Sequence, residues 1–121
     1  ELSWNRHDVA EFLGGYLTEP KPHVRFTPAR KPLSEAAFTR AAIRLGIALV
    51  PAALMLYGRG VIFINGEAQR MDEAQATPLR RLANTRNLSG RRIPRSGVVM
   101  HTLYRWYRDG YICLTKSAST A

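Results

Sequence analysis

Apolar positions recur at three- and four-residue steps in some segments and run together in others, and these two patterns predict helices and strands respectively. The first helical pattern covers residues 4–18. Its stripe is formed by Val9, Phe12, Leu13, Tyr16 and Leu17. Gly14-Gly15 lowers the stability of such a helix by roughly 1 kcal/mol per glycine. We therefore expect this helix to depend on a partner surface and to end at Thr18-Glu-Pro-Lys-Pro22.

A meander of three short strands is predicted in the middle of the chain. Val61-Ile-Phe-Ile-Asn-Gly-Glu67 carries four apolar residues and then the Asn-Gly pair that a two-residue type I′ hairpin turn requires. Residues 53–57 lead into it through Gly58-Arg-Gly60, and residues 67–71 follow it. A last short strand is expected over Tyr111-Ile-Cys-Leu114.

Local signals predict a helix after the prolines. Ser34 is placed as the N-cap, and Glu35 lies in the first turn, where the helix dipole favours negative charge. Leu33 and Phe38 have the spacing of a hydrophobic staple. Gly46 is expected to end this helix.

Two more helices are predicted in the second half of the chain. One is expected to begin with Thr77 as N-cap and Pro78 at its first position, where the missing N–H has no helical partner. Asp72-Glu73 is interpreted as helix-start charge and not as an acid/base pair. The other helix is expected to start near Ser96-Gly97 and to end at Gly110.

This order of elements predicts an α+β fold, namely a small winged-helix-like domain with a short antiparallel sheet, preceded by a helical appendage. Residues 1–18 are assigned to the helical appendage, and residues 19–33 to a linker rich in proline. The winged-helix-like domain is expected over residues 34–115, with a polar tail over 116–121. The expected core residues are Phe38, Leu56, Ile62, Ile64, Leu82, Leu103 and Trp106.

Composition limits the class and compartment of the protein. With 121 residues and 45% hydrophobic content, the chain is long and apolar enough for one packed domain. No apolar run reaches the roughly 20 residues that a membrane-spanning helix needs, and residues 1–15 lack the pattern of a signal peptide. The single cysteine, Cys113, excludes an internal disulfide and suits a reducing compartment, so we expect a cytoplasmic protein.

Residues that could perform catalysis are scattered. His7, His23 and His101 have no ligand spacing, so a zinc or iron site within the chain is not expected. His101 is interpreted as a boundary residue, and Cys113 as a buried structural thiol, because no base is predicted beside it. A self-sufficient enzyme is therefore the least favoured class.

The arginines are the strongest candidates for a functional site. The chain has 18 basic and 9 acidic residues, a net charge of +9, which favours an anionic partner. Residues 79–108 contain no Asp or Glu, and tyrosine and tryptophan alternate with the arginines near their end. The eight arginines are Arg80, Arg81, Arg86, Arg91, Arg92, Arg95, Arg105 and Arg108. Such guanidinium groups can bind phosphates of nucleic acid or the ribosome, and the alternative is an ordinary solvated surface.

Several strings also resemble a known family when taken in order. They are Glu11-Phe-Leu-Gly-Gly-Tyr-Leu-Thr18, the segment rich in proline, the helix over 34–45, Val61-Ile-Phe-Ile-Asn-Gly-Glu67 and Trp106-Tyr-Arg-Asp-Gly-Tyr-Ile112. Over residues 9–114 the chain resembles the C-terminal part of bacterial JmjC-type, cupin-superfamily ribosomal oxygenases, of the ribosomal-protein arginine hydroxylase type. The resemblance lies in the order and spacing of these motifs.

The resemblance implies an accessory domain and not a catalytic one. In that family an N-terminal barrel binds Fe(II) through a His-x-Asp…His triad and uses 2-oxoglutarate and oxygen to hydroxylate a ribosomal protein. A helical dimerisation region follows it, and the resemblance implies that residues 1–18 of this chain are the end of such a region. A winged-helix-like domain comes last. This chain lacks the triad, so no catalytic residue, Fe(II) or 2-oxoglutarate site carries over to it. The expected partners are a second copy of the protein and a ribosomal protein or RNA, and the alternative is an independent winged-helix module that binds nucleic acid.

Overall fold

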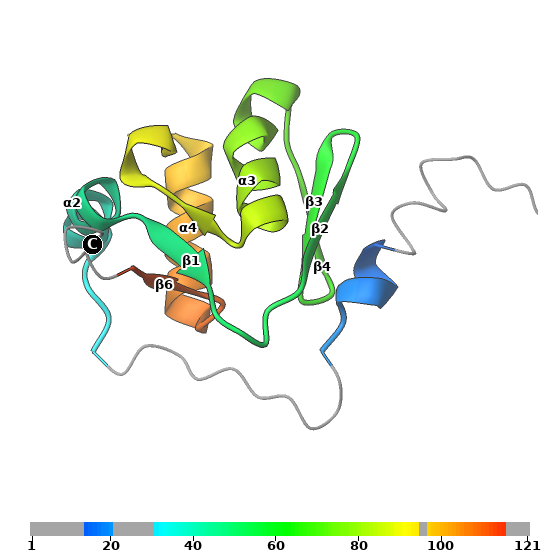
Figure 1. Cartoon of the computed structure of the whole chain (residues 1–121), viewed down its shortest axis with the longest axis horizontal. Helices are drawn as coiled ribbons and strands as arrows, with labels where there is room; N and C mark the ends of the chain where they lie inside the picture. Colours follow the sequence, from blue (N-terminus) through cyan, green and yellow to red (C-terminus); the bar gives the residue numbers. More distant parts are fainter. Residues whose placement is uncertain (1–13, 21–30, 95–96, 116–121) are drawn as a thin grey trace, which may run out of the picture.

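Two small antiparallel sheets of three strands each organise the structure (Figure 1). The computed structural model describes residues 14–20, 31–94 and 97–115. Sheet A has the strand order β5-β1-β6, and sheet B the order β2-β3-β4. The strands are β1 (Ile47–Leu49), β2 (Met55–Gly58), β3 (Val61–Ile64), β4 (Glu67–Arg70), β5 (Asn87–Leu88) and β6 (Ile112–Leu114). The helices are α2 (Glu35–Leu45), α3 (Glu73–Thr85), the short 3₁₀ helix η1 (Gly90–Arg92) and α4 (Val98–Asp109). Together these elements confirm the predicted α+β class.

Helix α2 begins and ends where the sequence predicts. The Ser34 side chain accepts a hydrogen bond from the backbone N–H of Ala37 at 3.2 Å, and Glu35 lies in the first turn. Gly46 follows the helix with φ of 86°, a conformation that glycine adopts without strain. Ahead of the N-cap, the backbone of Leu33 bonds to two tyrosine hydroxyls of α4.

Helix α3 starts earlier than predicted, so its expected start at Thr77 is wrong. Its N-cap is Asp72, whose side chain accepts a hydrogen bond from the N–H of Gln75 at 2.9 Å. Thr77 and Pro78 lie inside the helix, and the Thr77 hydroxyl donates to the carbonyl of Glu73. Two segments with N-cap chemistry occur five residues apart, and the first one starts the helix although Pro78 removes one helical hydrogen bond.

The predicted meander and its turn are confirmed in sheet B. Ile64 pairs with Glu67 across a two-residue turn in which Asn65 has φ of 50° and Gly66 φ of 89°. Asn65 is buried, and it also forms two hydrogen bonds with the residue just ahead of β2. Its N–H donates to the Leu54 carbonyl, and its side-chain oxygen accepts from the Leu54 N–H, both at 3.0 Å.

The core lies between the two sheets and the helices α2, α3 and α4. Six of the seven predicted core residues are buried, and Trp106 on α4 is completely so. Leu56 is the exception, because 41% of it is exposed. Its neighbour Met55 faces the core, and successive residues of a strand point to opposite faces, so Leu56 faces outward.

Strand β3 is buried on both faces, which requires a cover on the outer side of sheet B. Ile62 and Ile64 pack into the core, whereas Val61 and Phe63 are buried but lie outside that cluster. Residues 14–18 form a helical turn whose Gly14 lies directly against the Phe63 ring. Figure 1 shows this turn beside the strands of sheet B. The rest of the predicted helix over residues 4–18 lies outside the described residues.

Sheet A contains two strands, β1 and β5, that the sequence pattern did not predict. Strand β6 was predicted, and it pairs with β1 through Ala48↔Cys113 and Leu49↔Ile112. Ile112 is buried and Cys113 is exposed, so the prediction of a buried thiol is wrong. The two-residue period of a strand places these neighbours on opposite faces. Among the described residues, no helix has the length and hydropathy needed to cross a membrane.

Candidate functional site

The eight arginines predicted as a site fall into separate places in the fold. Arg95 lies outside the described residues. Arg80 and Arg81 lie on α3, Arg86 at its end, Arg91 and Arg92 on η1, and Arg105 and Arg108 on α4. The structure thus brings together only those of α3 and η1, which line one hollow.

Arg86 has a structural role. It follows the last turn of α3 in the left-handed conformation, with φ of 66°. Its Nη2 atom donates to the carbonyls of Val50 and Ala53 at 2.9 and 3.0 Å, with a longer contact to Pro51. Its own carbonyl accepts from the N–H of Leu49. Arg86 therefore joins the end of α3 to the turn that leads from sheet A to sheet B.

Arg80 is partly neutralised by an acid from outside the segment 79–108. Its guanidinium forms an ion pair with Glu73, about two turns earlier on the same face of α3. It also lies over the ring of Tyr57, 5.6 Å from the ring centroid, which is a cation–π contact. The absence of acids from a stretch of sequence therefore did not make every arginine in it uncompensated.

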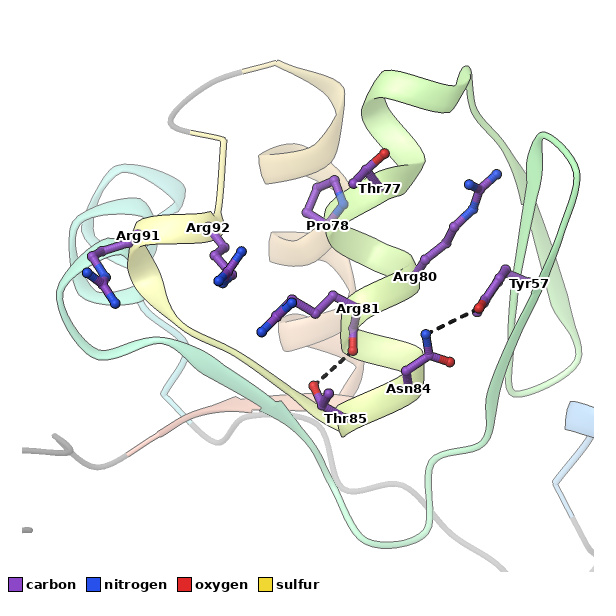
Figure 2. Close-up of a pocket in the computed structure, with 9 residues that line it drawn as sticks. All are labelled: Tyr57, Thr77, Pro78, Arg80, Arg81, Asn84, Thr85, Arg91 and Arg92. Atoms are coloured by element: carbon purple, nitrogen blue, oxygen red, sulfur yellow. Dashed lines mark hydrogen bonds between the residues drawn. The ribbon is translucent and has the colours of Figure 1, made fainter.

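Arg81, Arg91 and Arg92 form the least compensated part of the cluster. All three are exposed, and the described residues give none of them an ion pair. They line a hollow of about 620 Å³ between α3 and η1, which we call the basic hollow (Figure 2). Its lining residues are Tyr57, Thr77, Pro78, Arg80, Arg81, Asn84, Thr85, Arg91 and Arg92. No carboxylate is among the described residues that line it.

Neutral groups hold the wall of the basic hollow in place. The Asn84 amide donates to the hydroxyl of Tyr57 at 3.2 Å, which joins α3 to β2. The Thr85 hydroxyl donates to the carbonyl of Arg81 at 2.9 Å. Figure 2 shows both bonds, and it shows the side chains of Arg81 and Arg92 pointing into the space between α3 and η1.

Arg105 and Arg108 belong to a different surface. Arg105 lies 4.0 Å from a carboxylate oxygen of Glu67 on β4. Arg108 lies 5.9 Å from the ring centroid of Tyr104, four residues earlier on α4, which is a cation–π contact. Glu67 also accepts a hydrogen bond from the Tyr111 hydroxyl at 2.7 Å. Burial and this carboxylate raise the pKa of Tyr111 above its ordinary value.

Tyr57, Arg59 and Asn84 line the basic hollow or the hollow beside it, and the sequence did not point to them as site residues. A second hollow of about 560 Å³ adjoins the first and is lined by Tyr57, Gly58, Arg59, Glu73 and Arg80. Arg59 could have been found as a basic residue in a predicted hairpin turn. Tyr57 and Asn84 could not, because their contact spans 27 residues of sequence.

The described residues form no metal centre. They contain no group of three or more His, Cys, Asp or Glu side chains that could hold a metal ion. His101, predicted at a boundary, is exposed, and its Nδ1 lies 3.3 Å from Glu35 Oε2 between α4 and α2. The described residues therefore do not fit an Fe(II) site.

A helical core with a β-hairpin sheet at its side defines the class of the chain as a winged-helix domain. The chain belongs to the ROXA-like winged helix family, whose model matches residues 1–112. This confirms the resemblance to the C-terminal winged-helix region of ribosomal oxygenases. No curated protein sequence matches the chain significantly.

Solved structures of Escherichia coli YcfD share the fold. The structure described as YcfD, a ribosomal oxygenase, matches with a TM-score of 0.76 at 14% identity, over 91% of this chain and 31% of that one. An X-ray structure of the same protein gives 0.75 at 14% identity, over 90% and 30%. Its complex with cobalt and 2-oxoglutarate gives 0.73 at 15% identity, over 90% and 31%. The chain thus spans about a third of the length of these neighbours.

Proposed function

We propose that this chain is a non-catalytic accessory domain of a protein hydroxylase of the ribosomal oxygenase type, dependent on Fe(II) and 2-oxoglutarate. The observation that carries the proposal is the family match over residues 1–112. It is supported by the fold shared with a larger protein described as a ribosomal oxygenase, of which this chain spans 31%. In this proposal Fe(II) and 2-oxoglutarate bind in a separate catalytic domain, and the winged helix supports dimerisation or positions a ribosomal-protein substrate.

The outer surface of the helical turn over residues 14–18 supports a role in dimerisation. Gly14 and Thr18 are buried against sheet B, so one face of this turn is already used within the domain. Tyr16 and Leu17 are 65% and 58% exposed on the remaining faces. Large apolar side chains exposed at adjacent positions suit a contact with a second copy of the protein. We place the parent protein in the cytoplasm of a bacterium.

The first experiment is to measure the intact mass of the natural gene's product. The proposal expects a mass well above the 13.6 kDa of this chain, since the structural neighbours are about three times as long. A product of 13.6 kDa would contradict the accessory role. For the longer product, 2-oxoglutarate turnover with a ribosomal-protein substrate is then compared between wild type and Leu17→Ser. Light scattering of both proteins reports the oligomeric state in parallel.

The proposal expects Leu17→Ser to weaken the dimer or to lower turnover. Ala52→Ser, at an exposed position in the turn between β1 and β2, is the matched control and should change neither quantity. Unchanged assembly and unchanged turnover in Leu17→Ser would remove the dimerisation role of this turn. Loss of either quantity in both variants would show a general sensitivity to substitution and would also count against it.

A further inference from the structure

We infer that the basic hollow between α3 and η1 binds the phosphodiester backbone of a nucleic-acid strand, with Arg81 and Arg92 as the principal phosphate ligands. This deepens the proposed function, on which the choice of ribosomal RNA as the natural strand rests. The inference selects one site from the arginines that the sequence brought forward and assigns the others different roles.

The charges that line the basic hollow favour a bound anion. Arg81 on α3 and Arg92 on η1 both point into the basic hollow, and no described carboxylate lines it. Positive groups that share a hollow without a counter-charge repel each other, so the free protein is destabilised there relative to a state with a bound anion. Arg80, in contrast, already has Glu73 as its partner. The uncompensated charge therefore lies on Arg81 and the η1 arginines and not on Arg80.

The hydrogen-bond donors of the basic hollow also suit a phosphate. A guanidinium offers two parallel N–H groups that match two oxygens of a phosphate, and such charge-assisted bonds are stronger than neutral ones. The Thr77 hydroxyl and the Asn84 amide lie in the same lining and already bond within the protein. They fix the wall on which Arg81 is mounted. Charged donors on a helix that is held in place by such hydrogen bonds suit a phosphate better than an apolar or cationic ligand.

The charged surface extends beyond the basic hollow. The second hollow shares Tyr57 and Arg80 with the basic hollow and adds Arg59 from the turn between β2 and β3. Arginines therefore follow one another from η1 across α3 to the hairpin of sheet B, and Glu73, the partner of Arg80, is the one described carboxylate in the lining of the two hollows. A continuous row suits a polymer with regularly repeated charges, such as a nucleic-acid strand, better than a single small anion. The phosphates are the same at every nucleotide, so binding should be independent of base sequence.

The test uses the 121-residue chain, a fluorescently labelled single-stranded RNA of mixed sequence, and the DNA of the same sequence. Affinity is measured by fluorescence anisotropy over a series of salt concentrations. The site variant is Arg81→Gln/Arg92→Gln. The matched control, Arg105→Gln/Arg108→Gln, removes the same charge from exposed positions on α4. Thermal unfolding of both variants is measured in the same buffer.

The site variant should bind RNA at least about tenfold more weakly, and the control less than about threefold more weakly, because only the site variant loses charge-assisted phosphate bonds. For single strands each lost phosphate contact lowers the log–log salt slope by about 0.7, so the site variant should lose roughly 1.4. RNA and DNA should bind with similar affinity because they share the phosphate.

Equal losses in the two double variants would show a general charge effect and overturn the site. Undetectable RNA binding by the wild type, or a preference of more than about tenfold for one sugar type, would also contradict a phosphate-backbone site. Comparable binding of an oligoglutamate peptide, with the same dependence on Arg81 and Arg92, would reassign the hollow to acidic proteins and overturn the inference.

A second variant keeps the result interpretable if Arg81→Gln/Arg92→Gln unfolds. Arg81→Lys/Arg92→Lys keeps the charge but removes the paired donors, so the salt slope should be retained while affinity falls. Unchanged affinity in this variant would contradict the bidentate contact. None of these measurements uses oxygenase activity. Failure of the RNA site would leave the accessory role untouched, and a gene product of 13.6 kDa would leave the RNA measurement untouched.

Discussion

Gly14 lies so close to Phe63 that a β-carbon on Gly14 would stand 2.4 Å from two carbons of the aromatic ring. This contact joins the helical turn over residues 14–18 to the outer face of sheet B. The Thr18 hydroxyl supports it, since it accepts a hydrogen bond from the N–H of Gly66 at 2.8 Å and donates to the carbonyl of Gly14. Gly14 is therefore a packing residue, although glycine weakens a helix in isolation.

Gly14→Ala should destabilise the protein by about 1–3 kcal/mol, because the added methyl group overpacks the contact with Phe63. Gly15→Ala is the matched control. Among the described residues a β-carbon there meets only the carbonyl of Gly66, at 3.7 Å, so the same substitution should stabilise the helical turn by about 0.4–1 kcal/mol. Chemical denaturation of the three proteins measures both effects. Equal effects at the two glycines would show that the contact with Phe63 does not form.

Trp106→Ala should cost about 3–5 kcal/mol of unfolding free energy, because Trp106 is completely buried and its removal leaves a large cavity. Leu56→Ala serves as the comparison, since 41% of Leu56 is exposed, and it should cost less than about 1 kcal/mol. Urea denaturation gives both values. A small loss for Trp106→Ala would contradict its place in the core.

Arg86→Ala should lower the unfolding free energy by about 1.5 kcal/mol, since it removes charged hydrogen bonds to carbonyls of the turn over residues 50–53. Arg81→Ala, at an exposed position on the same helix, should change it by no more than about 0.5 kcal/mol. In RNA binding we expect the opposite order. If Arg81 proved the more important for stability, the assignment of Arg86 to structure and Arg81 to binding would be wrong.

Tyr111 should make the stability of the protein depend on alkaline pH. Its pKa is raised, first by burial and then by the hydrogen bond to Glu67, so folding favours the neutral phenol. A raised pKa contributes stability that is present below the ordinary value of 10.0 and is lost as the pH rises above it. The difference in unfolding free energy between wild type and Tyr111→Phe should therefore be constant up to about pH 9 and fall between about pH 10 and pH 12. A difference that stays constant over this range would contradict the raised pKa.

Signals that act over a few residues were enough to predict most helix ends and turns. Ser34 is the N-cap that its sequence suggested, and Asn65-Gly66 forms the hairpin turn, because each depends on the chemistry of immediate neighbours. The start of α3 could not be predicted in this way. Asp72 and Thr77 both have N-cap chemistry, and their own sequences do not decide between them.

The failures concern relationships across long stretches of sequence. The exposure of Leu56 depends on which face of β2 packs against the core. The exposure of Cys113 depends on the pairing of β6 with β1. The arginine cluster was predicted as one set because its members are neighbours in sequence. Its division into Arg86, the basic hollow and the α4 surface depends on partners 23 to 38 residues away, such as Val50, Tyr57 and Glu67.

The contact between Gly14 and Phe63 also determines how the domain would respond to a mechanical pull. The chain is held at residues 14–18 on sheet B and again at Leu33, whose backbone N–H and carbonyl bond to the hydroxyls of Tyr107 and Tyr104. A tension applied before Gly14 reaches the hairpin of β3 and β4 first, and the segment rich in proline bears no load until this contact yields. A pull applied ahead of Gly14 would thus act on sheet B before it acted on the helices.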